Sequence, residues 1–305
     1  MLTIDAPSLV VAMRKSIAAL LEGGEPTAPR GLPTVEIRPA VIVISDPRQR
    51  IVTWPGREVN PCFAAAETLW ILSGSDAAWI FEYNRALRRY ADGGVLKGAY
   101  GPRLRNWNGV KDQLAWVAGV LREDRSSRRA VIQIFDPASA DVSHRDVPCT
   151  ISFRFFIRNE CLSMHTLMRA NDVWRGMPYD IFCFTTIQEV LAAELGVELG
   201  DYVHMVDSLH LYDSDAARAR EAMRSEPYDD PRLTTHFAIG VGLDRLDEEL
   251  RRALDGDPSA TAFAEHAALL TIYRSLRHGG SASEEDVARL SPASRASLEL
   301  WKQRH

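Results

Sequence analysis

The residues with the clearest capacity for chemistry lie between Cys149 and Asp180. Cys149 ends a Val-Pro-Cys triplet, and a segment that reads MRANDVWRGMPYD follows it and ends at Asp180. A thiolate is a strong nucleophile, but an ordinary thiol titrates near about 8.5 and needs a positive neighbour to ionise at neutral pH. Arg169 and the pair Arg128 and Arg129 are candidates for that neighbour. The pattern predicts a cysteine nucleophile; the alternative is a buried, inert thiol.

A second group with chemical potential is Glu67, the only charge in the apolar stretch CFAAAETLWIL. Desolvation on such a helix raises the pKa of a carboxyl, which suits a general acid or base. The alternative is a structural hydrogen bond or a position that faces solvent. His210 and Tyr212 stand at alternate positions of a predicted strand, so their side chains share one face.

The bulk properties limit the classes of function. The chain has 305 residues and a net charge of −5, which argues against a broad nucleic-acid surface. It lacks a run of 18 apolar residues and the pattern of a signal peptide, so we expect no membrane partner and a cytoplasmic location. Four cysteines without paired or zinc spacing indicate a reduced protein without a metal site, in which Cys62, Cys161 and Cys183 are small buried side chains.

Periodicity predicts the elements that position these residues. Helices are expected over 9–21, 62–72, 77–91, 110–121 and 181–195, from 213 to about 224, and from 244 to the end with a break at Gly279 and Gly280. Strands are expected over 35–44, 129–135, 150–158, 161–168, 201–212 and near 233–239, with a tight turn at 159–160. Loops are expected over 25–33, which holds Arg30, and over 93–102, which holds Tyr100. The pattern favours one α+β domain.

Several stretches together resemble the thymidylate synthase superfamily. They are AAETLWILSGSD, GAYGPRLRNW, SSRRAVIQIFDP, the long run VPCTISFRFFIRNECLSMHTLMRANDVWRGMPYDI, and GDYVHMVDSLHLYDSD, in family order over about 25–230. The resemblance implies the thymidylate synthase fold, a mixed β-sheet packed by helices, as a single domain over 1–305. Residues from about 240 to 305 would form a divergent helical C-terminal region.

The resemblance also implies a reaction and its residues. Cys149 would add to C6 of a pyrimidine so that C5 can attack the one-carbon unit of 5,10-methylenetetrahydrofolate. Glu67 would handle protons through water, and Tyr100 would take part in the proton steps near the nucleophile.

Other matching positions would bind the substrates. Arginine forks suit phosphate oxygens, and His210 and Tyr212 would bind the sugar 3′-hydroxyl, while Asp172 would bind the pterin ring. The phosphate-binding positions are Arg30, Arg169, Arg128 and Arg129. The last two match a pair that reaches across a dimer interface, so the resemblance implies a homodimer.

The chain departs from the synthases at the base-reading position, where Pro178, Tyr179 and Asp180 replace a triplet that ends in asparagine. An asparagine amide complements the carbonyl and N3–H of uracil. An ionised aspartate accepts from the amino group of cytosine, and a protonated one also donates to its N3; against uracil it would face the lone pairs of O4, a mismatch worth about 1–3 kcal/mol. The change resembles the CMP and dCMP 5-hydroxymethylases of the superfamily.

Two further departures concern the product and the sugar. Leu87 aligns with a tryptophan that lies beside the exocyclic methylene, so a smaller side chain would let water reach that carbon and yield a hydroxymethyl product. Ala170 replaces a serine near the phosphate and sugar, which makes room for a ribose. The synthases also end in an apolar segment that closes over the folate, whereas this chain ends in LWKQRH.

We therefore predict that the chain converts CMP to 5-hydroxymethyl-CMP, as expected in nucleoside-antibiotic biosynthesis; a phage enzyme would serve DNA modification. The alternatives are a dCMP hydroxymethylase, then a thymidylate synthase or dUMP hydroxymethylase, then a non-catalytic nucleotide-binding or RNA-binding relative. Binding alone needs no thiol, so Cys149 argues against the last.

Overall fold

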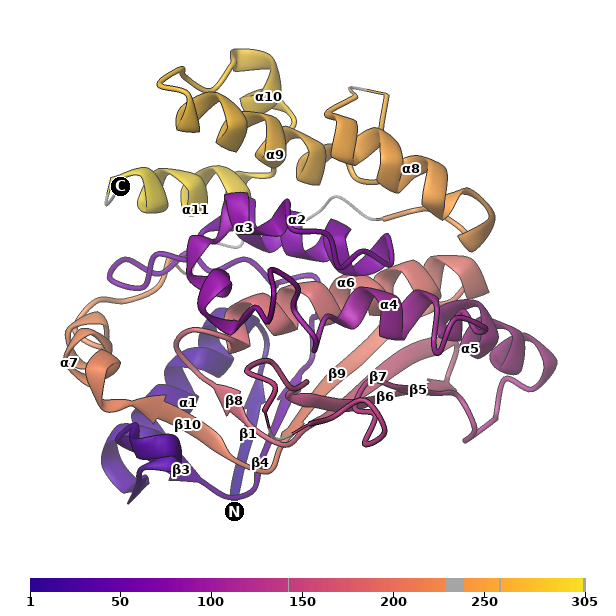
Figure 1. Cartoon of the computed structure of the whole chain (residues 1–305). Coiled ribbons are helices and arrows are strands. Elements are labelled where there is room, and N and C mark those ends of the chain that lie inside the picture. Colours follow the sequence, from indigo (N-terminus) through magenta and orange to yellow (C-terminus); the bar gives the residue numbers. More distant parts are fainter. Residues whose placement is uncertain (142, 229–238, 258, 304–305) are drawn as a thin grey trace.

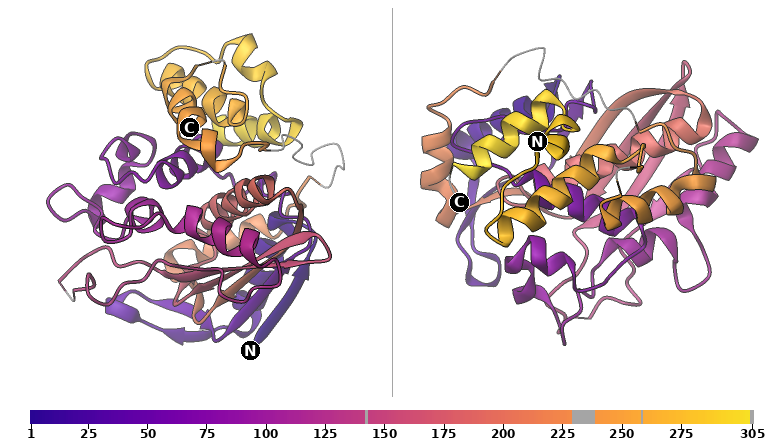
Figure 2. Two further views of the ribbon diagram at one scale, coloured as in Figure 1. Left: turned by 90° about the vertical axis from the view of Figure 1, so that its right-hand side faces the viewer. Right: turned by 90° about the horizontal axis from the view of Figure 1, so that it is seen from above.

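The helices and strands of this computed structural model form three layers. The structure describes residues 1–141, 143–228, 239–257 and 259–303. A large sheet lies at the base, α6 (Met177–Leu195) packs on one of its faces, α2 (Pro61–Leu72) packs against α6, and the C-terminal helices cover α2 (Figure 1). Figure 2 shows the same order of layers from the side. The mixed strands and covering helices agree with the predicted α+β fold.

The strands form two sheets. The larger contains, in spatial order, β1 (Leu2–Ala6), β4 (Ala40–Ile44), β9 (Glu198–Val206), β7 (Cys161–Met168), β6 (Thr150–Arg158) and β5 (Val131–Gln133). The smaller contains β2 (Glu25–Thr27), β3 (Thr34–Ile37), β10 (Leu209–Tyr212) and β8 (Asn171–Asp172). β9 pairs with β7 in parallel and with β4 in antiparallel fashion, so the large sheet is mixed.

The remaining helices surround this framework. They are α1 (Leu9–Gly23), η1 (Pro29–Gly31), α3 (Ile80–Tyr83), η2 (Arg85–Tyr90), α4 (Tyr100–Arg105), α5 (Gln113–Glu123), α7 (Asp213–Ala222), α8 (Leu243–Asp255), α9 (Ala264–Arg277), α10 (Glu284–Ala288) and α11 (Pro292–Lys302). Within the described part of the chain, no helix is long and apolar enough to cross a membrane.

Burial alternates along the strands of the large sheet. On one face, Ile42, His204 and Met164 are fully buried against the helices. The opposite face carries partly exposed side chains, and the apolar ones among them are Val41, Val43, Val131, Phe156, Leu167, Val203 and Met205. Such alternation is typical of a sheet with one covered face.

Helix α2 lies in the middle of the layers. Asn60 caps it by accepting the N–H groups of Cys62 and Phe63 at 3.0 and 3.1 Å. Of its twelve residues, only Glu67 is not fully buried. α6 packs on one side of α2, and α8, α9 and α11 pack on the other, which explains why the helix carries almost no polar residues.

The structure confirms several predicted elements. The hairpin of β6 and β7 turns at Asn159 and Glu160, which both adopt left-handed backbone angles, with φ of 51° and 57°. Helix α6 ends at Gly196, where φ is 63°. Cys62 and Cys183 are buried, whereas Cys161 is partly exposed and departs from its prediction. The strand expected near 233–239 lies almost entirely outside the described residues.

Other predicted elements are divided. The strand expected over 35–44 is two strands in different sheets, because Pro39 lacks the N–H that a continuous strand needs. The helix expected over 77–91 is α3 and η2, separated by Asn84, whose side chain accepts from Ala86 N at 3.1 Å and begins a new turn.

The strand expected over 201–212 also divides, at 207–208, into β9 and β10 of different sheets. Parts of the two predicted loops are ordered as well. The segment 25–33 contains β2 and η1, and Tyr100 begins helix α4 instead of lying in a turn.

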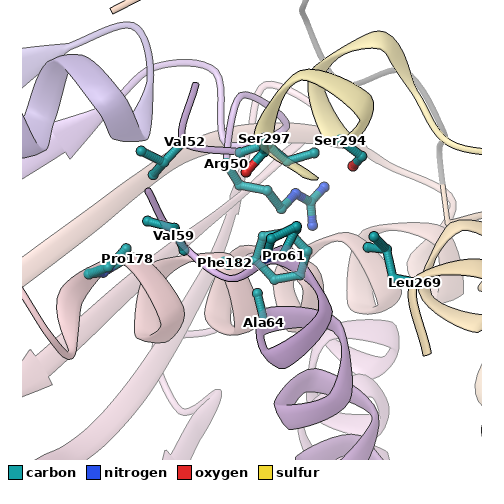
Figure 3. Close-up of a pocket in the computed structure, with 11 residues that line it drawn as sticks. Arg50, Val52, Val59, Pro61, Ala64, Pro178, Phe182, Leu269, Ser294 and Ser297 are labelled. Carbon is teal, nitrogen blue, oxygen red and sulfur yellow. The ribbon is translucent and has the colours of Figure 1, made fainter. Parts of the chain in front are cut away.

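A small cavity lies where α2, α6, α9 and α11 meet (Figure 3). Phe182 and Leu269 line it together with the buried Arg50. Cys149 and Glu67 are not among its lining residues, so this cavity is separate from the candidate active site.

Candidate active site

The loop that carries Cys149 is held by Arg169. The guanidinium donates from Nε to Pro148 O at 3.0 Å and from Nη2 to Val147 O at 2.9 Å, and the backbone N–H of Arg169 donates to Cys149 O at 2.9 Å. Arg169 is exposed and Cys149 is partly exposed at the start of β6. The structure therefore brings a cation beside the thiol, as the sequence predicted.

Opposing charges act on that thiol. Burial is the largest influence and raises the pKa of Cys149, and the charges of Asp180 and Asp146 raise it further. The Arg169 and Arg30 guanidiniums lower the same pKa. The thiolate form of Cys149 is thus stabilised by Arg169 and Arg30. An anion bound to these arginines would offset their charge and raise the pKa of the thiol.

Asp146 is a residue of this site that sequence reasoning missed. Its carboxylate accepts the N–H of Gly98 at 2.9 Å, which ties the cysteine loop to the segment before Tyr100. A Cβ at Gly98 would lie 2.9 Å from Asp146 Oδ1, so a side chain there would displace the carboxylate. The only signal in the sequence is its place three residues before Cys149.

Tyr100 lies next to Cys149. Its hydroxyl oxygen accepts the N–H of Thr150 at 3.2 Å, and Thr150 directly follows Cys149. Burial raises the pKa of the Tyr100 phenol well above its usual value, and the charges of Asp180 and Cys149 add to this effect. The phenol therefore remains protonated and lies within electrostatic reach of both groups.

Glu67 and Asp180 approach the same space from two helices. Burial raises the pKa of Glu67 to about 8, and the charge of Asp180 contributes. Burial likewise raises the pKa of Asp180 to about 7, opposed by a hydrogen bond from Asn171 Nδ2 to Asp180 Oδ2 of 2.7 Å. Both side chains keep some solvent exposure, so each can exchange protons near neutral pH.

Strand pairing brings Asp172 to His210. β8 and β10 pair in parallel, with Asp172 opposite His210, although the residues are far apart in sequence. The rings of His210 and Tyr212 lie edge to face at 5.2 Å, which confirms that they share a face. Asp172 Oδ1 accepts the N–H groups of Trp174 and Arg175 at 2.8 and 3.0 Å. Its Oδ2 is buried, and no hydrogen-bond partner for it occurs among the described residues.

The predicted arginines do not all meet. Arg30 is exposed with φ of 54°, and its charge lowers the pKa of both Cys149 and Tyr212, so it lies near the site. Arg128 and Arg129 are exposed beside the edge strand β5. In the described regions of this single chain, no hydrogen bond or ion pair joins them to the residues around Cys149.

For Leu87 and Ala170, the structure gives only the position of each residue in the fold. Leu87 lies in η2, partly buried against the core. Ala170 lies between Arg169 and Asn171 and is partly buried. Asn171 itself is the second residue that sequence reasoning missed.

These features place the Cys149 thiol beside Arg169, and they place that thiol, the carboxyl of Glu67 and the phenol of Tyr100 within electrostatic reach of Asp180. Residues 21–244 match the family described as thymidylate synthase. The chain belongs to the thymidylate synthase family.

Known relatives include three phage proteins, each described as a deoxyuridylate hydroxymethyltransferase. That of Bacillus phage SP01 is 36% identical over 213 residues, which are 65% of this chain and 56% of the relative. Those of Pseudomonas phage M6 and Delftia phage PhiW-14 are each 33% identical, over 57% and 64% of this chain and 51% and 58% of the relatives. The chain thus spans little more than half the length of these relatives.

Proposed function

We propose that this protein is a folate-dependent pyrimidine nucleotide C5-hydroxymethyltransferase that acts on CMP. The reaction joins CMP, 5,10-methylenetetrahydrofolate and water to give 5-hydroxymethyl-CMP and tetrahydrofolate. The observation that carries the choice of base is Asp180, a carboxyl within electrostatic reach of Cys149, Glu67 and Tyr100. The relatives' descriptions support the hydroxymethyl transfer.

The chemistry follows from the side chains. The Cys149 thiolate, supported by Arg169, adds to C6 and delivers an electron pair to the ring, which makes C5 nucleophilic. Glu67, with a pKa of about 8, can hold a proton at neutral pH and deliver it through water. Tyr100 stays protonated and donates a hydrogen bond to a water that takes up the proton released from C5. Cys149 departs from C6 when the ring regains its double bond.

Asp180 supports cytosine as the base. Its ionised form accepts from the exocyclic amino group, and its protonated form also donates to N3. With a pKa of about 7, both forms are populated at neutral pH.

Deoxyuridylate is the second candidate, favoured by the descriptions of the relatives. Only a protonated Asp180 can donate to O4 while it accepts from N3–H, so this candidate requires the acid form throughout. Activity on uracil nucleotides should then fall as the pH rises above about 7, the pKa of Asp180.

The folate fits residues of this chain. Asp172 Oδ2 is a buried acceptor that lies 3.9 Å from Arg175 Nε and has no hydrogen-bond partner among the described residues, which matches the N–H groups of a pterin ring. 5,10-Methylenetetrahydrofolate supplies a carbon at the oxidation level of formaldehyde. Leu87 is smaller than an indole and leaves space for water near that carbon, which supports a hydroxymethyl product. Ala170 offers no hydroxyl to the sugar and supports a ribonucleotide, so the product would serve nucleoside-antibiotic biosynthesis rather than DNA modification.

We also propose a homodimer in which Arg128 and Arg129 bind the phosphate in the partner's site. The uncovered face of the large sheet is rich in partly exposed apolar side chains, and it suits a second copy. Both arginines are exposed beside β5, at the edge of that sheet. We treat residues 240–305 as part of the same domain, since α8, α9 and α11 pack on α2, and we propose a cytoplasmic location.

Product analysis tests the reaction. The protein is incubated with CMP, dCMP, UMP or dUMP and the folate, and the products are identified by mass. Hydroxymethylation of CMP is expected. Hydroxymethylation of uracil nucleotides alone would refute the argument from Asp180, and a methylated product with dihydrofolate would refute water capture. Cys149→Ala should abolish tritium release from C5 of the substrate.

Mixed dimers test the shared site. In the proposed dimer, Cys149 acts in its own subunit's site and Arg129 in the site of the partner. The Cys149→Ala and Arg129→Ala variants should therefore each be inactive alone. After exchange of subunits in equal amounts, about one site in four regains both residues, so about a quarter of the activity should return. No recovery in mixtures shown to exchange subunits would place Arg129 outside the partner's site.

A further inference from the structure

A buried chain of hydrogen bonds runs behind Asp180. Tyr202 Oη lies 2.9 Å from His204 Nδ1, His204 Nε2 lies 2.9 Å from Asn171 Oδ1, and Asn171 Nδ2 donates to Asp180 Oδ2 at 2.7 Å. Tyr202 and His204 have no solvent exposure and Asn171 is 4% exposed. Of the residues in this series of hydrogen bonds, only Asp180 at its end reaches the candidate active site.

The direction of these bonds is fixed by the acceptor at the end. An ionised carboxylate only accepts, so Asn171 must turn its amide nitrogen toward Asp180 and its oxygen toward His204. His204 then donates from Nε2, which leaves Nδ1 to accept from the Tyr202 hydroxyl. Burial lowers the pKa of His204 to about 3, so the ring is neutral and carries only one N–H to give.

Gly176 shows how closely this bond is packed. A Cβ at Gly176 would lie 3.2 Å from both Asn171 Nδ2 and Asp180 Oδ2. Gly176 also receives the N–H of Asp180 at its carbonyl, at 3.0 Å, in the first turn of α6. The carboxyl is therefore held by its backbone on one side and by Asn171 on the other.

We propose that Asn171 is the positioning residue of the base-reading carboxylate: it occupies Asp180 Oδ2, which leaves Oδ1 as the oxygen that accepts from the amino group of cytosine. This inference rests on the proposed role of Asp180 and adds how the preference for an amino-bearing base is enforced. The donated N–H favours the ionised carboxylate, which complements an amino group and repels O4 of uracil. Tyr202 and His204 act through Asn171 by fixing the orientation of its amide.

The test uses three variants of the full chain. Asn171→Ala removes the donor to Asp180, and Tyr202→Phe keeps the ring and removes only the hydroxyl at the far end. Gln188→Met is the matched control. Gln188 is a buried amide of α6, the helix that carries Asp180, but it donates to the backbone carbonyls of Leu162 and Gly200.

The first readout needs no substrate. The carboxyl of Asp180 is titrated by carbon-13 NMR in the ligand-free protein and assigned by its loss in Asp180→Asn. Asn171→Ala should raise the pKa of Asp180 by about one to two units, because the ionised carboxylate loses a hydrogen bond that stabilises it. Tyr202→Phe should shift it less in the same direction, and Gln188→Met should not shift it.

The second readout is the preference for the base. The ratio of kcat/KM for CMP over UMP should fall at least about tenfold in Asn171→Ala, mainly through KM for CMP, with a smaller fall in Tyr202→Phe. If the carboxyl shifts but wild-type protein turns over no cytosine nucleotide, the proposed function fails and the positioning of Asp180 stands. If Asn171→Ala and Tyr202→Phe titrate as wild type, or if cytosine preference persists in both, the inference is refuted.

Discussion

Replacing Asp180 by asparagine should flatten the dependence of stability on pH. Burial moves the pKa of this carboxyl from 3.8 to about 7. In the unfolded chain it ionises near its ordinary value, so between those two pH values the unfolded state binds fewer protons than the folded state. The free energy of unfolding therefore falls as the pH rises through this window and levels off above the folded pKa.

The magnitude follows from that shift. Each pKa unit corresponds to about 1.4 kcal/mol, so from about pH 5 to about pH 8 the buried carboxyl costs up to about 3 kcal/mol. Its partial exposure to solvent reduces this to roughly 1–2 kcal/mol. Asp180→Asn retains a similar shape and removes the charge. Between about pH 5 and about pH 8, the free energy of unfolding of the variant should therefore fall by roughly 1–2 kcal/mol less than that of wild type.

Urea unfolding followed by circular dichroism at the two pH values measures the difference. Asp76→Asn is the control, because Asp76 is exposed near the end of α2 and its removal should leave the difference unchanged. Glu67 adds to the expected effect, since the charge of Asp180 raises its pKa. Equal losses of stability in wild type and Asp180→Asn would refute the buried, proton-exchanging carboxyl.

Three further predictions concern other parts of the molecule. Asp146→Asn keeps an acceptor for Gly98 but removes a charge that raises the pKa of Cys149, so alkylation of the thiol near neutral pH should accelerate roughly threefold; a slower rate would contradict this account. Ala170→Ser should shift the ratio of CMP to dCMP turnover toward the deoxynucleotide by about tenfold, and an unchanged ratio would dismiss its role in sugar choice. Tyr273→Phe removes the hydroxyl that donates to Glu82 O at 2.9 Å, so the free energy of unfolding should fall by about 1 kcal/mol, and no change in the urea midpoint would show that the bond adds nothing.

The predicted elements that hold in the structure are those with a strong local signal. The hairpin over 150–168 and the helix predicted over 181–195 have clear periodicity and clear stops, so local preferences decide them, although the helix begins earlier in the structure, at Met177. The divided strands at 35–44 and 201–212 are different, because each half pairs with a different sheet. Pairing is a tertiary choice that β-branched composition alone does not reveal.

The same distinction applies to the site. The types and local surroundings of Cys149 and Glu67 mark them as candidates, the family resemblance adds Tyr100, and the structure brings all three within electrostatic reach of Asp180. The partnership of Asn171 with His204 joins residues 33 apart in sequence, and no local pattern marks it. The proposed roles of the arginines beside β5 depend on a second subunit, which periodicity and spacing do not describe.

The burial of α2 on every side constrains how this protein can be altered. A helix that exposes almost nothing but Glu67 gains part of its stability from neighbours that come late in the chain, since α8, α9 and α11 cover one side of it. Deletion from α8 onward would expose the apolar surface of α2 to solvent and promote aggregation. The shortest stable fragment must therefore retain these last helices.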